Sequence, residues 1–216
     1  MKILHPDIPE VLSDTDDITS LLLVDDKLRG LHMKNCDISS RRLKGMAIEE
    51  SLVVKTNFSQ THLESFETKD CRFKDCDFTA SSLASSSWHV IEVSGARCSG
   101  IQLQTSVLKN VLFKGCKLEL ANFRFAKLEN VIFEDCLIND IDFYNATLKN
   151  VVFSGSSIEN ITFAGARLKN VDLSDAQLVS VKNVSGLKGA TISYEQLTFL
   201  APYFTQELGI LIKEQS

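Results

Sequence analysis

Six cysteines give this 216-residue chain its greatest potential for chemistry, because a thiolate can ligate a metal, form a disulfide or act as a nucleophile. Four of them are separated by multiples of twenty residues: Cys36, Cys76, Cys116 and Cys136. Other small residues occupy the same position in the remaining twenties: Thr56, Ala96, Ser156 and Ala176. A position that accepts Cys, Ala, Ser and Thr alike requires a small side chain rather than a sulfur atom. The pattern predicts buried, reduced thiols, which are typical of a cytosolic protein.

The histidines and serines form no recognisable catalytic motif. The four histidines lack the spacing of a metal site, and no Cys-x-x-Cys motif accompanies them. Serines are dense from Ser81 to Ser87 and His89 follows, but a serine nucleophile needs a base that a third group holds in place. The ten glycines are dispersed, so no phosphate-binding loop is indicated. We expect no catalytic, cofactor-binding or metal site, and a protein that is not an enzyme.

A period of five runs through most of the chain. From Ile18 to Leu178, thirty-two of thirty-three residues at five-residue intervals are apolar, and Thr68 is the exception. The residue two places earlier is usually small or β-branched, so two of every five side chains suit burial. A helix repeats a face every 3.6 residues and a strand every two, so neither fits as a continuous element. The chain must turn a corner every five residues, and four corners close a coil of twenty.

The twenty-residue coil is also visible in repeated hexapeptides, which begin at Leu108, Leu128 and Leu148. Phenylalanines at central positions are predicted to form a structural core: Phe113, Phe123, Phe133, Phe143, Phe153 and Phe163. Asparagines recur at one position of the coil: Asn110, Asn130, Asn150 and Asn170. Asn favours turns and bonds to neighbouring groups, so we interpret this column as a structural ladder, with a binding site as the alternative.

The pentads follow the pattern A(D/N)LXX, as in Ala121-Asn122-Phe123 and Ala176-Gln177-Leu178, and in this the chain resembles the pentapeptide-repeat family. The resemblance implies an all-β solenoid, a right-handed quadrilateral parallel β-helix of about eight coils of twenty residues with a C-terminal α-helical cap. We expect an N-terminal acidic cap over residues 1–17 and the β-helix over residues 18–183. Residues 184–216 are expected to form the C-terminal helical cap and a candidate dimerisation element.

Two positions depart from the pattern inside the repeat. Thr68 takes a central place and Phe66 the small place two residues before it, which we interpret as an exchange that conserves core volume. Trp88 is central by register, and the small Ser86 and Ser106 are expected to give its ring room and its N–H a partner.

The C-terminal segment carries more apolar side chains than a cap requires. Ser193 is suited to begin a helix, Gly209 to end it, and Pro202 to divide it into two pieces. One helical face is expected to cover the last coil: Leu197, Leu200, Phe204 and Leu208. Four further residues remain: Phe199, Tyr203, Ile210 and Leu211. We predict that they form a homodimer interface across a two-fold axis, and the alternative is that they seal the monomer.

Charge is distributed unevenly along the chain. The formal net charge of −5 comes from residues 1–27, whereas residues 28–178 carry eighteen acidic and eighteen basic side chains. The chain is also similar to the quinolone-resistance branch of the family, which implies DNA gyrase as a partner bound through mimicry of DNA. Such mimicry needs acidic columns along the rod. One short acidic group remains as a candidate: Glu134, Asp135, Asp140 and Asp142.

These observations predict a non-enzymatic scaffold or protein-interaction rod whose partner is a protein of unknown identity. A DNA-mimic, gyrase-binding protein is the alternative function. The balanced rod does not suggest a nucleic-acid partner, and the absence of an apolar run of eighteen residues does not suggest a membrane span, so we expect a cytoplasmic protein.

Overall fold

Left-handed residues make the corners of the coil. From Gly30 to Asn170, every fifth residue has a φ between 48° and 71°. Asn, Asp and Gly, which tolerate this conformation, hold many of these positions, whereas Val90, Leu120 and Phe125 adopt it at a cost of about 1–2 kcal/mol each. One such residue in each pentad bends the chain between short extended segments, so the period of five becomes a stack of four-sided coils.

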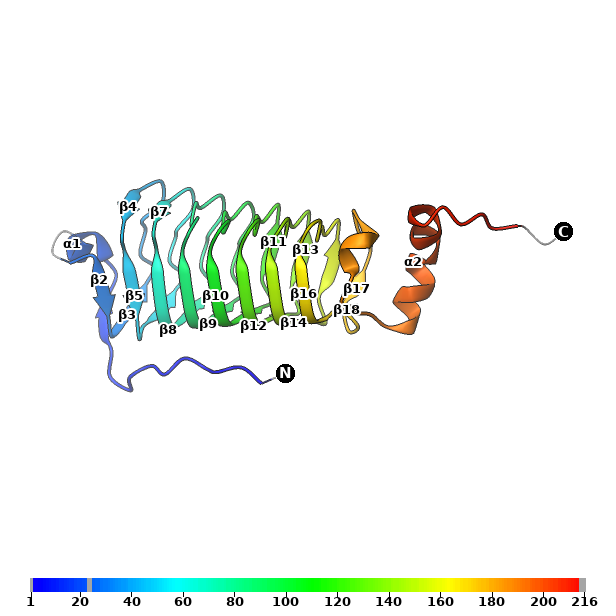
Figure 1. The fold of residues 1–216 in the computed structure, drawn as a ribbon. Helices are drawn as coiled ribbons and strands as arrows, with labels where there is room; N and C mark the ends of the chain where they lie inside the picture. The colour runs from blue at the N-terminus through cyan, green and yellow to red at the C-terminus, as the bar shows by residue number, and fades with distance from the viewer. Residues whose placement is uncertain (1, 23–24, 214–216) are drawn as a thin grey trace.

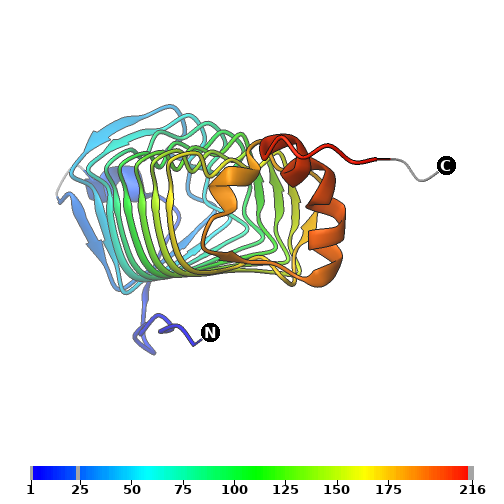
Figure 2. The same cartoon turned by 45° about the vertical axis from the view of Figure 1, so that its right-hand side comes forward.

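The computed structural model describes residues 2–22 and 25–213, which form a parallel β-solenoid with a helix at its C-terminal end (Figure 1). Leu23 of the pentad register, and Met1 and residues 214–216 of the expected caps, lie outside the described residues. The predicted fold class is confirmed, and Figure 2 shows the stacked coils along the rod. The stack has about nine turns rather than eight, because β1 and β18 extend it at its ends. At about 4.8 Å per coil, the solenoid is about 43 Å long.

In chain order the elements are β1 (Ser13–Thr15), α1 (Ile18–Leu22), β2 (Lys27–Arg29), β3 (Leu31–Lys34), β4 (Arg42–Lys44), β5 (Ala47–Glu49), β6 (Leu52–Val54), β7 (His62–Glu64), β8 (Glu67–Lys74), β9 (Ser87–Ser94), β10 (Val107–Lys114), β11 (Lys117–Glu119), β12 (Lys127–Glu134), β13 (Leu137–Asn139), β14 (Thr147–Ser154), β15 (Ser157–Glu159), β16 (Arg167–Asp172), β17 (Gln177–Leu178), the 3₁₀ turn η1 (Val184–Leu187), β18 (Ala190–Thr191) and α2 (Tyr194–Glu207).

We number the four faces of the rod by central residues of one coil: Leu108 on face 1, Phe113 on face 2, Leu118 on face 3 and Phe123 on face 4. Faces 1 and 2 share a twelve-stranded sheet that bends at the corner residues. Face 3 carries the four strands β11, β13, β15 and β17, and face 4 carries β4 and β7. Strands pair in parallel with a register of twenty residues through the repeats, for example Phe113 with Phe133. Residues twenty apart therefore form columns along the rod.

Two aromatic columns fill the core. The rings of Phe113, Phe133 and Phe153 stack on face 2 with centroid separations of 5.2 and 4.8 Å. On face 4 the separations are 5.1 Å from Phe123 to Phe143 and 5.4 Å from Phe143 to Phe163. All six side chains are fully buried. Between the columns, rings meet edge to face at three places, for example Phe123 and Phe133 at 6.3 Å, which is a favoured aromatic geometry.

The shape of the coil changes along the rod on face 4. The first two coils are extended there, as β4 and β7, but the third closes in a tight turn in which the Ser86 N–H donates to the Leu83 carbonyl at 3.3 Å. Large residues follow the extended segments, Met46 and Phe66, whereas Ser86 follows the tight turn. A wider coil leaves more core volume, and larger side chains fill it.

This change of shape accounts for the two irregular positions. Phe66 and Thr68 are both buried, which confirms the predicted exchange of sizes in the wide coil. The exchange leaves the Thr68 hydroxyl buried without a hydrogen-bond partner among the described residues. Trp88 is fully buried in the next coil, and its Nε1–H donates to the Ser86 hydroxyl at 3.0 Å, as the sequence suggested.

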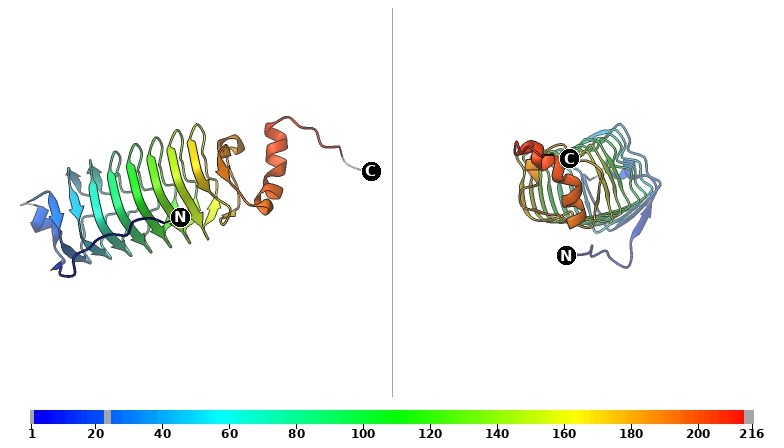
Figure 3. Two further views of the ribbon diagram at one scale, coloured as in Figure 1. Left: turned by 60° about the horizontal axis from the view of Figure 1, so that its bottom comes forward. Right: turned by 90° about the vertical axis from the view of Figure 1, so that its right-hand side faces the viewer.

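The N-terminal segment does not cover the end of the rod. Parallel pairing begins at Ser13, opposite Leu31, within the segment expected to be a cap. The first coil is covered by α1, whose Ile18 is buried. Residues 2–12, which we name the N-terminal strap, run back along the outside of the strands (Figure 3). The Asp7 N–H donates to the Asp70 carboxylate at 3.3 Å, which places the strap beside the third coil.

At the other end, α2 lies across the last coil, as the end-on view in Figure 3 shows. Ser193 and Gln196 form a capping box at its start. The Gln196 side chain also donates to the carbonyls of Leu173 and Ala176, at 2.7 and 2.6 Å, and so satisfies part of the open strand edge.

The expectation that Pro202 divides this helix is wrong, because α2 is continuous from Tyr194 to Glu207. Proline removes one backbone donor, but the capping box holds the first turn and the Leu208 N–H donates to the Phe204 carbonyl at 3.0 Å in the last.

Candidate interaction surfaces

The cysteines lie in the core, away from solvent. All six are free and buried. Burial raises the pKa of the Cys71 thiol to about 11 and that of Cys76 to about 12, so neither forms a thiolate at neutral pH. The Cys76 thiol donates to the Val53 carbonyl at 3.5 Å, and Cys136 makes the equivalent contact with Phe113 at 3.4 Å.

The histidines and the serine-rich segment make structural contacts. His32 Nδ1 lies 2.8 Å from the Asp14 carboxylate, which joins β3 to β1. The Ser81 hydroxyl donates to the Phe78 carbonyl at 2.7 Å, and the hydroxyls of Ser86 and Ser106 bond to each other at 3.0 Å. Within residues 2–22 and 25–213, no group of three or more His, Cys, Asp or Glu side chains is arranged to hold a metal ion.

The step between the wide and tight coils of face 4 leaves a hollow of about 340 Å³ that is open to solvent. Arg42, Lys44, His62 and Glu64 line it, and Lys44 and Glu64 form an exposed ion pair at 3.4 Å. Ser82 also lines the hollow, in register with His62, and no hydrogen bond between their side chains is found among the described residues.

The four asparagines of the column at the corner between faces 1 and 2 are linked by their side chains. Asn130 donates through its Nδ2 to the Asn110 Oδ1 at 3.3 Å. Asn150 donates to Asn130 at 2.9 Å, and Asn170 donates to Asn150 at 2.9 Å. Each is a left-handed corner residue, so the column combines a favoured conformation with a hydrogen bond between coils.

Several acidic residues on the rod lie against cations from other coils. The pairs and their N–O distances are Lys114–Glu134 at 2.7 Å, Lys182–Asp140 at 2.6 Å, Arg124–Asp142 at 3.4 Å and Lys149–Glu129 at 2.6 Å. The idea of one local acidic group is wrong, because the register puts Glu134 on face 2 and Asp142 on face 4. The spacing of charges in the sequence did not reveal this, since neighbouring pentads lie on different faces.

An aromatic cluster on face 4 was not identified from the sequence. Phe125 is half exposed, and its ring lies edge to face against Tyr144 at 5.7 Å. The Arg124 guanidinium lies 4.6 Å from the Tyr144 ring centroid, and Leu120 is exposed at the preceding corner. The available signal was a large apolar residue at a corner position, where Asn, Asp and Gly are common.

The C-terminal end presents the larger apolar surface. Phe199 and Tyr203 are each 42% exposed, Ile210 is 54% exposed and Leu211 is 96% exposed. Of the face expected to cover the last coil, Leu200 is buried but Leu197 and Leu208 are exposed. Tyr194 and Ile212 add to the exposed set, so half of the exposed large apolar side chains that the described residues provide lie between positions 194 and 212.

No helix that the described residues form is long and apolar enough to cross a membrane.

Residues 106–182 match the model of the pentapeptide repeat region. No curated protein sequence matches the chain. Among solved structures, the chain is similar to a trypsin-treated form of QnrB1, described as a plasmid-mediated fluoroquinolone resistance protein. The identity is 20%, the TM-score is 0.43, and the match covers 94% of this chain and 100% of that one.

A second similar structure is HetL, a pentapeptide repeat protein involved in heterocyst differentiation regulation in the cyanobacterium Nostoc sp. strain PCC 7120. It shares 15% identity with a TM-score of 0.45, and the match covers 82% of this chain and 95% of HetL. Likenesses at these identities carry no conclusion about activity or partner.

Proposed function

We propose that this pentapeptide-repeat protein is a non-enzymatic interaction rod that pairs with a second copy of itself through its C-terminal end and binds a partner protein along its sides. The filled core supports this proposal, because the two stacked phenylalanine columns leave the chemistry of the chain to its outer columns. The six buried, free thiols suit a reducing compartment such as the cytosol.

The observation that carries the proposal is the apolar surface of α2 and the residues after it. Phe199 and Tyr203 lie on α2 with their ring centroids 6.1 Å apart, and Ile210 and Leu211 follow the helix. Aromatic residues are enriched at the centres of protein interfaces, whereas they are costly to leave in water. A second copy of the same surface covers them across a two-fold axis, in a closed arrangement that does not extend to filaments.

The test is the mass of the protein in solution, measured by sedimentation equilibrium over a range of concentrations. The full chain is expected as a dimer, and the double variant Phe199→Asp, Tyr203→Asp as a folded monomer. Leu120→Asp, which adds the same charge at an exposed apolar position on the rod, is the matched control and is expected to remain a dimer. A monomeric full chain at all concentrations contradicts the proposal.

A DNA-mimic that binds gyrase is the alternative function. Three ion pairs on the rod argue against it, since Glu134, Asp140 and Asp142 each lie against a cation that offsets the negative charge a DNA mimic needs. A DNA supercoiling assay with purified gyrase distinguishes the two functions. If the protein is an interaction rod, micromolar protein is expected neither to inhibit gyrase nor to protect gyrase from a fluoroquinolone. Either effect on gyrase favours the alternative.

A further inference from the structure

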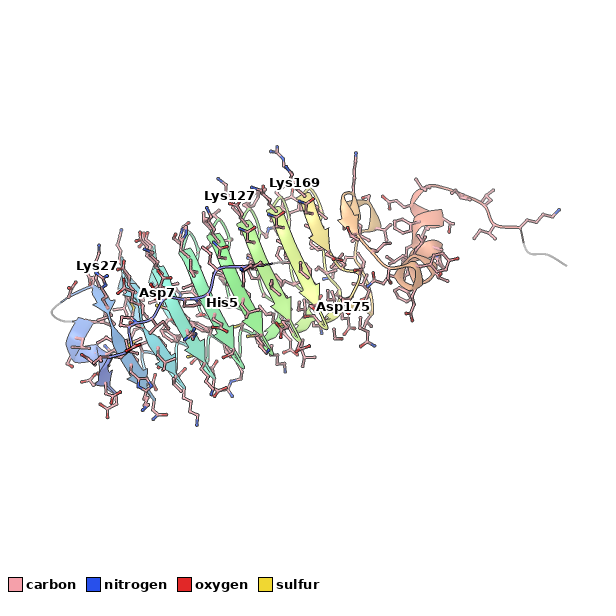
Figure 4. The ribbon with its side chains drawn as sticks, turned by 90° about the horizontal axis from the view of Figure 1, so that it is seen from below. His5, Asp7, Lys27, Lys127, Lys169 and Asp175 are labelled. Carbon is pink, nitrogen blue, oxygen red and sulfur yellow. The ribbon has the colours of Figure 1, made fainter. Side chains whose placement is uncertain are left out.

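The N-terminal strap lies on the outer surface of the rod as a docked peptide. Figure 4, in which His5 and Asp7 are labelled, shows it crossing the strands of several coils. Ile3 and Pro6 are buried, although Leu4, His5 and Asp7 between and beside them are exposed. Buried residues three apart, one of them proline, are typical of an extended segment with the three-residue turn of polyproline II. The strap therefore makes selective contacts through one side.

Face 2 carries an apolar column on its outer side. Leu112 points outward from β10, in register with Ile132 on β12 and Val152 on β14. Leu112 is only 7% exposed, whereas Ile132 and Val152 are partly exposed. Asn110 is also 7% exposed, although Asn170 of the same column is exposed. The strap crosses the strands of the earlier coils and is positioned to produce this difference in exposure (Figure 4).

We propose that face 2 is a docking surface for an extended segment of a partner protein with the pattern Ile-x-x-Pro, and that the N-terminal strap occupies this surface until the partner displaces it. This inference rests on the proposed interaction function and names the side of the rod that the partner uses. The partner segment is expected to resemble the strap, with an isoleucine and a proline that pack against the column at Leu112 in place of Ile3 and Pro6. Because the strap is held at high effective concentration, it lowers the apparent affinity of any competing segment.

The test uses the full chain and a fluorescent peptide with the sequence of residues 2–12, followed by fluorescence anisotropy. The double variant Ile3→Asp, Pro6→Asp frees the surface and is expected to bind the peptide saturably, at least tenfold more tightly than the unmodified chain. Adding Leu112→Lys to this variant is expected to weaken binding at least tenfold. Adding Leu120→Lys, an equal change at an exposed leucine outside face 2, is the control and leaves binding unchanged.

A freed chain that keeps its circular dichroism spectrum but binds no peptide overturns the proposal, as does binding that ignores Leu112→Lys. A second measurement covers the case in which the strap variants do not fold. Leu112→Lys in the otherwise unmodified chain is expected to speed tryptic cleavage after Lys2 severalfold, and an unchanged rate also overturns the proposal. The assay does not involve α2, so its failure leaves the dimer proposal standing, and a monomeric protein leaves peptide docking standing.

Discussion

Val90 is the corner residue immediately before the asparagine column, and replacing it measures how the column stabilises the fold. It lies one coil before Asn110, between the paired positions His89–Lys109 and Ile91–Val111. Its φ is 57°, a left-handed conformation that a β-branched residue rarely adopts. In the next coils each asparagine donates to the one before it, so an acceptor at position 90 would extend the series.

Val90→Asn is therefore expected to stabilise the protein. Relief of the left-handed conformation contributes about 1 kcal/mol, since Asn tolerates it. A new hydrogen bond from the Asn110 amide contributes about 1 kcal/mol more, and loss of the partly buried valine offsets a fraction of the total. The expected net gain in the free energy of unfolding is about 1–2 kcal/mol. Val90→Gly relieves the same backbone without supplying an acceptor, so its expected change is about zero once glycine's greater freedom in the unfolded chain is included.

Urea unfolding followed by circular dichroism compares the three proteins, with equal m values required for the comparison. We expect the urea midpoint of Val90→Asn to be higher by about 0.5 M than that of Val90→Gly. If the two variants unfold together, the side-chain ladder adds nothing to stability. If Val90→Asn is less stable than the original chain, the cost assigned to the corner is also refuted.

Three further predictions concern the core, the thiols and acid stability. Phe133→Ala is expected to lower the free energy of unfolding by about 4 kcal/mol in urea titrations, because it empties the stacked column, whereas Phe125→Ala on the surface changes it by about 0.5 kcal/mol or less. The six thiols are expected to react with a chromogenic disulfide reagent only in denaturant, since burial excludes the reagent and raises the pKa of Cys71 and Cys76; fast reaction of the native protein contradicts this. Burial raises the pKa of Asp77, but hydrogen bonds from Thr79 and Arg97 outweigh it, so the folded pKa lies below the ordinary value and the stability that it contributes is present above the unfolded pKa. Thermal midpoints should thus fall below about pH 4, and less steeply in Arg97→Gln; an equal fall removes Arg97 from the explanation.

The sequence predicted the coil because each pentad carries the same local instruction. A central apolar residue, a small residue two places before it and a turn-forming residue two places after it, as in Phe133, Val131 and Asp135, specify one corner regardless of the neighbouring coils. An irregular residue in one pentad does not change the corners of the next. The register of twenty residues and the buried phenylalanines could therefore be predicted from the sequence. The change from wide to tight coils correlates with the size of residues such as Phe66 and Ser86. It could be predicted from the sequence only by a reader who already knew the two turn shapes.

The ends and the outer surface were harder to predict because they depend on contacts between distant segments. The burial of Ile3 and Pro6 depends on packing of the strap against the rod, whose outward positions the pentad pattern treats as ordinary solvent positions. The continuity of α2 through Pro202 depends on a capping box and on Gln196 bonding to the last coil, and helix propensity alone contains neither. Local rules fixed the interior of this protein, whereas its interaction surfaces arise from long-range packing.

The most direct test of the interaction rod is the length of the particle in solution, from small-angle X-ray scattering of the full chain. Two solenoids of about 43 Å joined through α2 at their C-terminal ends give a rod more than about 90 Å long, and Phe199→Asp, Tyr203→Asp shortens it to about half. The end-to-end dimer is expected to have the cross-section of one coil along its whole length. A full-length protein with the dimensions of a single rod, or a dimer with a doubled cross-section, would contradict it.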